Sequence, residues 1–171
     1  QGNRKPSCSC ADGDEENRNL WQWFMEESIK EFERTYKLLG IKFDVWRGES
    51  PYEKELKPLI KSLLDSGVAK ESEGGIVIPL EKYNLPPGLI QKSDGATLYL
   101  TRDIASLRYR VKEYKPEKII YVVGNEQTLF LQQVFAISKI LGLDKAELVH
   151  AKYGMVLDEK KKKFSTREGE T

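Results

Sequence analysis

Residues 93–130, SDGATLYLTRDIASLRYRVKEYKPEKIIYVVGNEQTLF, contain the pattern that decides the fold. We predict a strand over residues 97–101, a helix over residues 103–114 and a second strand over residues 118–123. The second strand is almost continuously apolar, as expected of a parallel strand that is covered on both faces. This stretch therefore predicts the start of an α/β sheet.

The alternation continues towards the C-terminus. A helix is predicted over residues 126–141, ended by Gly142, and a third strand over residues 147–151. Strands separated by helices of this length are joined by right-handed crossovers in a parallel sheet. We therefore predict that residues 93–157 form a βαβαβ core.

The first half of the chain lacks this rhythm. A helix is predicted over residues 14–39, with Gly40 as its C-cap, and a short strand over residues 41–46. We expect the apolar face of the helix to pack against the sheet rather than to bind a ligand. That face contains Trp21, Phe24, Met25, Ser28, Ile29, Phe32, Tyr36 and Leu39.

A second helix is predicted to start near residue 50. Ser50 is its expected N-cap, Pro51 its first-turn proline and Glu53 the capping-box partner. This helix is expected to end at Gly67. The alternation that follows, over residues 68–70 and 75–79, predicts a small hairpin insertion at one edge of the sheet. Residues 84–88, with two prolines, are predicted to form a loop.

The composition of the chain excludes few classes of function or partner. The 28 basic and 27 acidic residues leave a net charge of +1, which gives no argument for nucleic-acid, membrane or acidic partners. No apolar run is long enough to span a bilayer. Residues 1–13 are expected to be a disordered linker in which Cys8 and Cys10 are free thiols, and both chain ends are expected to be cuts in a longer protein.

Polar side chains cluster near the predicted strand ends. Asp103 follows Tyr99 by four residues, and a carboxylate beside a phenol suits a guanidinium, although Asp103 also fits a helix N-cap. Gln127 either occupies a helix start or meets a ligand. His150 is more often structural in such a place, and backbone groups near Met155 can bond an adenine edge.

The C-terminal segment is rich in lysine, and by composition it is either a solvated tail or a phosphate-binding loop. Lysine and hydroxyl groups in a loop containing Gly169 can close over a triphosphate and stabilise its charge. The residues concerned are Lys163, Ser165, Thr166 and Arg167. Neither a GxGxxG fingerprint nor a P-loop is present.

Taken in order, SDGATLYLTRDIA, VVGNEQTLFLQQVF, HAKYGMVL and KFSTREGET resemble the later half of the catalytic domain of the arginyl-tRNA synthetases, a class I family. The earlier LGIKFDVWRGES resembles the segment that precedes this half. The resemblance covers roughly residues 13–171. It implies the second half of a Rossmann-like parallel sheet, with residues 14–92 as helices and hairpin insertion and residues 158–171 as a KMSKS-like loop, in a cytoplasmic enzyme.

The resemblance also implies a function. Family members use ATP, with Mg²⁺, to convert L-arginine to arginyl-adenylate, and then transfer the arginine to tRNA(Arg). The positions that match the family's arginine site are Tyr99, Asp103 and Gln127. Those that match its ATP site are His150, Gly154, Met155 and Val156, and the loop that handles pyrophosphate matches Lys163, Ser165, Thr166 and Arg167.

Several departures qualify this resemblance. The HIGH motif and the anticodon-binding region are absent, so we expect the chain alone to be inactive. Thr166 and Arg167 replace the Lys and Ser of KMSKS, and Leu129 stands where the family often has His. The alternatives are a non-catalytic module that binds an amino acid, nucleotide or protein, and a different class I synthetase.

Overall fold

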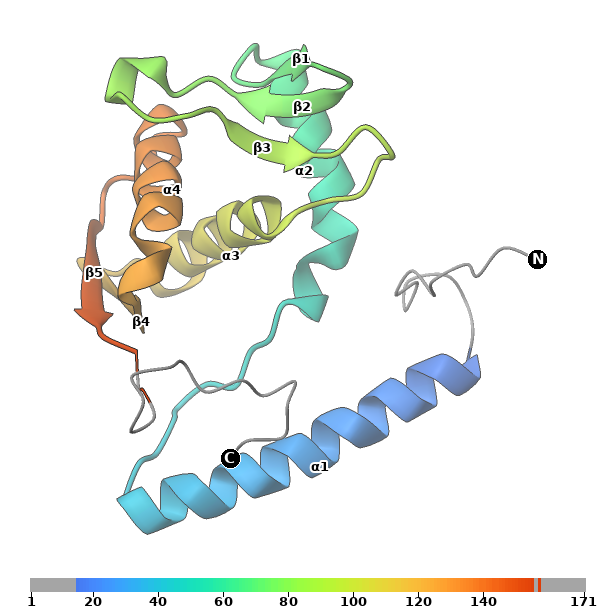
Figure 1. Cartoon of the computed structure of the whole chain (residues 1–171), viewed down its shortest axis with the longest axis vertical. Helices are drawn as coiled ribbons and strands as arrows, with labels where there is room; N and C mark the ends of the chain where they lie inside the picture. Colours follow the sequence, from blue (N-terminus) through green and yellow to red (C-terminus); the bar gives the residue numbers. More distant parts are fainter. Residues whose placement is uncertain (1–14, 156, 158–171) are drawn as a thin grey trace. The chain divides into compact units, whose positions relative to one another are not determined.

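The computed structural model describes residues 15–155 and residue 157, and the chain divides between Arg47 and Gly48 into two compact units (Figure 1). In the first unit, α1 (Glu15–Leu39) is a single long helix, as predicted. It ends at Gly40, whose φ of +69° suits a residue without a Cβ, and the Ile41 amide donates to the Tyr36 carbonyl over 2.8 Å. No residue of α1 is buried, so the expected packing of its apolar face on a sheet stays a prediction.

The predicted strand over residues 41–46 is wrong, because this segment has no regular secondary structure. Its apolar side chains pack on the helix before them instead. The ring centroids of Phe43 and Trp46 lie 4.9 Å and 5.8 Å from that of Tyr36. Apolar alternation predicts a strand only where another strand can satisfy the backbone amides.

In the second unit, a 3₁₀ turn, η1 (Ser50–Tyr52), leads into α2 (Glu53–Asp65), which ends before Gly67 as predicted. The predicted capping box is wrong. Ser50 lies inside η1 rather than at an N-cap, and neither helix start has a side-chain cap. The Glu53 carboxylate instead binds the Arg102 guanidinium over 3.2 Å, an interaction that local sequence does not reveal.

The predicted hairpin is confirmed, as β1 (Lys70–Ser72) and β2 (Gly75–Ile78), but it belongs to a three-stranded antiparallel sheet. The third strand, β3 (Gly88–Gln91), begins inside the predicted loop. Gly88 marks a close approach, since a Cβ there would lie 2.8 Å from Cδ2 of Leu100. Proline and glycine are uncommon inside strands, so a segment with two prolines and a glycine is predicted as a loop even where a short strand forms.

The predicted strand over residues 97–101 is also wrong, because α3 (Tyr99–Tyr114) begins there. Thr97 forms only an isolated bridge to Gln91. The Thr101 hydroxyl donates to the buried Ile90 carbonyl of β3, which fixes the first turn of α3 against the sheet. Apolar side chains of α3 then enter the core at helical spacing, namely Leu100, Ile104, Ala105 and Leu107.

The parallel βαβ unit is confirmed. It contains β4 (Lys118–Gly124), a 3₁₀ turn η3 (Asn125–Gln127), α4 (Thr128–Ile140) and β5 (Glu147–Tyr153). β4 and β5 pair in parallel register, from Lys118 opposite Glu147 to Gly124 opposite Tyr153. The fold class is therefore mixed α/β with one parallel and one antiparallel sheet, as expected (Figure 1).

Coverage of β4 on both faces is not observed. Along β4, half-buried and exposed residues alternate, and Ile120 and Val122 remain 56% and 68% exposed. The core of the unit lies instead between α2, α3, α4 and the antiparallel sheet. None of the helices described here is long and apolar enough to cross a membrane.

Candidate functional site

Tyr99 and Asp103 both lie on α3, one helical turn apart, rather than at a strand end. Leu98 occupies the N-cap position, so the alternative that Asp103 caps the helix is wrong. The Tyr99 side chain begins the helix and is 70% exposed, whereas Asp103 is half-buried. The phenol and the carboxylate therefore stand on adjacent turns, one facing solvent and one partly withdrawn from it.

The surroundings of Asp103 disfavour its charged form. Burial, together with the charge of Glu49, raises the pKa of the Asp103 carboxyl to about 6, although the Arg110 guanidinium opposes this rise. Within residues 15–155 its carboxylate forms no ion pair. A partly desolvated carboxylate without a cationic partner is a suitable receptor for a cationic ligand.

Arg102, the cationic residue next to Asp103 on α3, already forms ion pairs with two other carboxylates. The Arg102 side chain, only 25% exposed, lies 3.7 Å from a Glu49 carboxylate oxygen and 3.2 Å from one of Glu53. These two carboxylates come from the segment before α2 and from its first residue. Arg102 is thereby held on the α2 side of α3, so its charge does not neutralise Asp103.

Gln127 is exposed and ends η3, directly after β4. Because β4 and β5 are parallel and in register, Gly124 lies beside Tyr153, which places residues 125–127 and 154–155 at one edge of the sheet. Ligands of α/β proteins gather at this carboxyl edge. Only three residues join α3 to β4, and Arg110 of α3 lies over the ring of Tyr121 on β4.

His150 lies inside β5, opposite Tyr121, rather than at the end of a strand. Its Nε2 donates to the Val123 carbonyl over 3.1 Å, so the imidazole already has a structural role. Tyr153 and Met155, further along, are 57% and 52% exposed. The carboxyl end of β5 therefore has accessible groups, whereas its middle does not.

Some predicted residues fall outside the part of the chain that the structure describes. They are Val156, Lys163, Ser165, Thr166 and Arg167, together with Cys8 and Cys10. Among the described residues, no group of three or more His, Cys, Asp or Glu side chains is placed to hold a metal ion.

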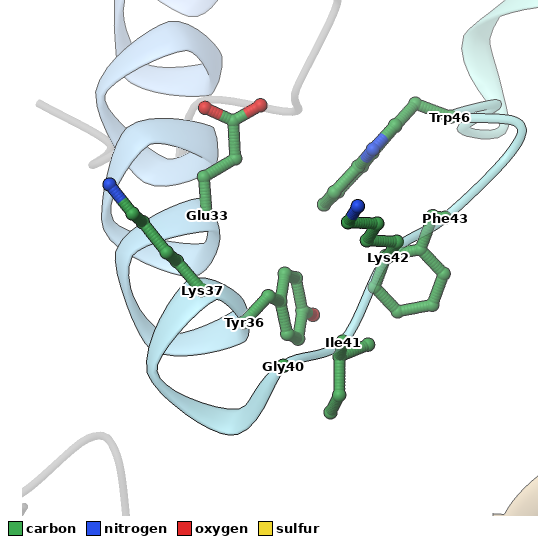
Figure 2. A pocket seen from close by; sticks show the side chains of 8 residues that line it. All are labelled: Glu33, Tyr36, Lys37, Gly40, Ile41, Lys42, Phe43 and Trp46. Carbon is green, nitrogen blue, oxygen red and sulfur yellow. The ribbon is translucent and has the colours of Figure 1, made fainter.

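A separate hollow of about 380 Å³ lies in the first unit, at the end of α1 (Figure 2). Figure 2 shows Tyr36 projecting from α1 towards the following segment, which carries Phe43 and Trp46, and the ring centroids of these two are 5.3 Å apart. Lys37 and Lys42 border the same hollow. None of the predicted site residues lines it.

Sequence reasoning missed Arg110 as a neighbour of Asp103. The signal is their seven-residue spacing, two turns of a helix, which places both on one face. The predicted helix over residues 103–114 already contains both residues, so this signal was present in the sequence.

The chain is similar to known proteins over most of its length. Residues 4–171 match the family described as tRNA synthetases class I (R), catalytic domain. The arginine–tRNA ligases of Pediococcus pentosaceus and Clostridioides difficile are each 48% identical over 158 residues, which is 92% of this chain and 28% of each relative. The chain thus spans just over a quarter of the length of these curated relatives.

Solved structures show the same likeness. The crystal structure of arginyl-tRNA synthetase from Plasmodium falciparum matches with a TM-score of 0.78 and 30% identity, over 86% of this chain and 26% of that one. A putative arginyl-tRNA synthetase from Campylobacter jejuni shares the fold with a TM-score of 0.70 at 20% identity, over 90% of this chain and 34% of that one. Since the family match covers nearly the whole chain, this protein belongs to the class I arginyl-tRNA synthetases and corresponds to part of their catalytic domain.

Proposed function

We propose that this chain forms the arginine-binding part of an ATP-dependent arginine–tRNA ligase. The observation that carries the proposal is the Asp103 carboxylate, which is partly desolvated on α3 and has no ion-pair partner in the described part of the chain. A guanidinium offers such a carboxylate two parallel hydrogen bonds and a full positive charge. The two named ligases of 48% identity support arginine as the cation.

Within this proposal, Asp103 binds the guanidinium of arginine, Tyr99 lines the pocket and Gln127 binds the α-amino end. The arrangement discriminates by charge, because citrulline cannot neutralise Asp103 and leaves its partly buried carboxylate unpaired. A site built around a buried polar group rejects an analogue that lacks its partner by about 10⁴- to 10⁵-fold. Lysine keeps the charge but loses the planar pair of donors.

The nucleotide lies further along the carboxyl edge in this proposal. Gly154, Met155 and Val156 contact the adenine side, and His150 supports them through its strand. The Lys163, Ser165, Thr166 and Arg167 loop stabilises the leaving pyrophosphate, and Mg²⁺ accompanies the ATP phosphates, its usual ligands. The substrate carboxylate attacks the α-phosphate directly, so the protein supplies positioning and electrostatics rather than a nucleophile.

The complete reaction belongs to a longer protein in this proposal, because the chain spans 28% of its curated relatives. That protein would bind L-arginine, ATP and tRNA(Arg), and would act in the cytoplasm. A non-catalytic module is the competing reading. The two differ in whether arginine drives exchange of pyrophosphate into ATP.

The experiment is pyrophosphate exchange by the full-length protein, with arginine, lysine, glutamine or citrulline, each with and without tRNA(Arg). We expect exchange with arginine and at most about 1% of that rate with the other three. Exchange that arginine does not stimulate, with tRNA present or absent, would contradict the proposed function and favour the non-catalytic module.

The 171-residue chain alone is expected to give no arginine-dependent exchange, at least about 10⁴-fold below the full-length protein. The reason is that positioning of both reactants contributes many kilocalories per mole, and the HIGH motif is missing from this chain. The same assay on the isolated chain measures this, with addition of the full-length protein as the control for inhibitors. Exchange above the buffer blank would show that the arginine and ATP sites are both complete in these residues.

A further inference from the structure

Arg110 lies on the same face of α3 as Asp103, two turns further along the helix. Its guanidinium carbon is 5.7 Å from the centre of the Tyr121 ring on β4, within the range of a cation–π contact. Tyr121 is held in turn by α4, since its ring centroid is 5.6 Å from that of Phe135. Packing between two helices and a strand therefore fixes the position of the Arg110 charge.

The hydroxyl of Tyr121 lies in the same place. Its oxygen is buried, and within the described residues no group completes a hydrogen bond to it. A buried hydroxyl without a partner is unfavourable, and the Arg110 guanidinium over the same ring is a neighbouring donor. Burial raises the pKa of Tyr121 while the charge of Arg110 lowers it, so the two groups do interact.

Arg110 also acts on Asp103, and the neighbouring charges do not replace it. Three groups facing Asp103 influence it or are influenced by it, namely Arg110 on its own helix, Glu49 before η1 and Tyr121 on β4. Glu49 disfavours the carboxylate, whereas Arg110 favours it. Arg102 is engaged with Glu49 and Glu53 on the α2 side.

We propose that Arg110 is a positioning residue whose fixed charge, held over Tyr121, keeps Asp103 ionised for the guanidinium of substrate arginine without touching the substrate. Two helical turns separate the two side chains, so Arg110 acts across space and forms no ion pair that would occupy the Asp103 oxygens. This inference rests on the proposed function. It adds a positioning residue outside the arginine-binding set.

The test is the pH dependence of kcat/KM for arginine in full-length Arg110→Gln, measured by pyrophosphate exchange between pH 5.5 and 8. Since the Asp103 pKa is about 6, we expect the acid midpoint of the parent near that value. Loss of a nearby opposite charge is expected to raise the midpoint by about one pH unit. At pH 6.5 kcat/KM would then fall about threefold, and at pH 8 it would be almost unchanged.

Three variants make the result specific. Arg110→Lys, which keeps the charge, is expected to restore the parent midpoint, and Arg108→Gln, at an exposed position of the same helix, is expected to leave it unchanged. Tyr121→Phe removes only the hydroxyl and is expected to raise the midpoint by less than Arg110→Gln. It also serves as the test if Arg110→Gln does not fold, as judged by circular dichroism.

An unchanged midpoint in Arg110→Gln (or in Tyr121→Phe, if Arg110→Gln does not fold), or an equal loss of kcat/KM at every pH, would overturn the role of Arg110. Arginine-dependent exchange by the parent would still stand in that case. Absence of arginine-dependent exchange in the parent itself would instead contradict the proposed function, so the two failures are distinguishable.

Discussion

Replacing Asp103 by asparagine in the full-length protein is expected to lower kcat/KM for arginine by about 10²- to 10³-fold. Truncation or neutralisation of one partner of a buried, hydrogen-bonded charge pair costs about 2–5 kcal/mol, and asparagine keeps the size of the side chain while removing its charge. The KM for ATP should change less than about twofold. Pyrophosphate exchange at varied arginine and at varied ATP measures both.

The same substitution is expected to stabilise the ligand-free fold. The pKa of Asp103 rises from 3.8 to about 6 on folding, so the folded state binds the proton more tightly and the free energy of unfolding decreases as pH rises through this interval. Above about pH 6 the ionised carboxylate carries the full penalty, and asparagine removes it. At pH 7 the Tm of the 171-residue Asp103→Asn chain should therefore rise by a few degrees, and at pH 4 it should not.

Glu113→Gln is the matched control, because Glu113 is an exposed carboxylate on the same helix. It is expected to change neither arginine activation nor Tm appreciably. If the Asp103→Asn protein is inactive and also less stable at pH 7, the substitution has damaged α3 in general. Loss of activity with gain of stability is the combination expected of a carboxylate held for a ligand.

Leu56→Ala is expected to give the largest loss of stability, about 2–5 kcal/mol in the free energy of unfolding. Leu56 is 0% exposed in the core of the second unit, and its removal leaves a cavity between α2 and the elements packed on it. Urea denaturation of the 171-residue chain, followed by circular dichroism, measures the change in midpoint.

Leu89→Ala is the control for Leu56→Ala, because the same atoms are removed from a side chain on β3 that is 40% exposed. It should cost well under half as much, since exposed apolar surface gains less from burial. Equal losses in the two variants would mean that the core does not lie where the structure places it.

Several features follow from the sequence alone. Apolar residues at helical spacing, followed by a glycine, predict α1 and its end at Gly40. The β4–α4–β5 unit follows from strand and helix periods in succession, and it brings Gln127 and Met155 to one edge without further information. The sequence also places Tyr99 close to Asp103, but it assigns Tyr99 to a strand, and only the structure shows that both lie on one helix, a turn apart.

Other features required the tertiary structure. The segment at residues 97–101 has strand-like composition, yet α3 begins at Tyr99, because the Thr101 hydroxyl bonds to the Ile90 carbonyl of a strand eleven residues away. Glu53 fits a capping box, but its carboxylate binds Arg102. In both cases a partner distant in sequence gives more stabilisation than the local pattern, and local patterns carry no information about such partners.

For the candidate site too, the sequence determined some properties and the tertiary structure determined others. Residue types and order determined that Asp103 is a candidate receptor for a guanidinium, since that depends on chemistry present in the side chain itself. Only the tertiary structure decided the direction of its pKa shift, because the shift depends on the burial of Asp103, the like charge of Glu49 and the opposite charge of Arg110. Electrostatic energies depend on distance and burial, which residue order does not specify.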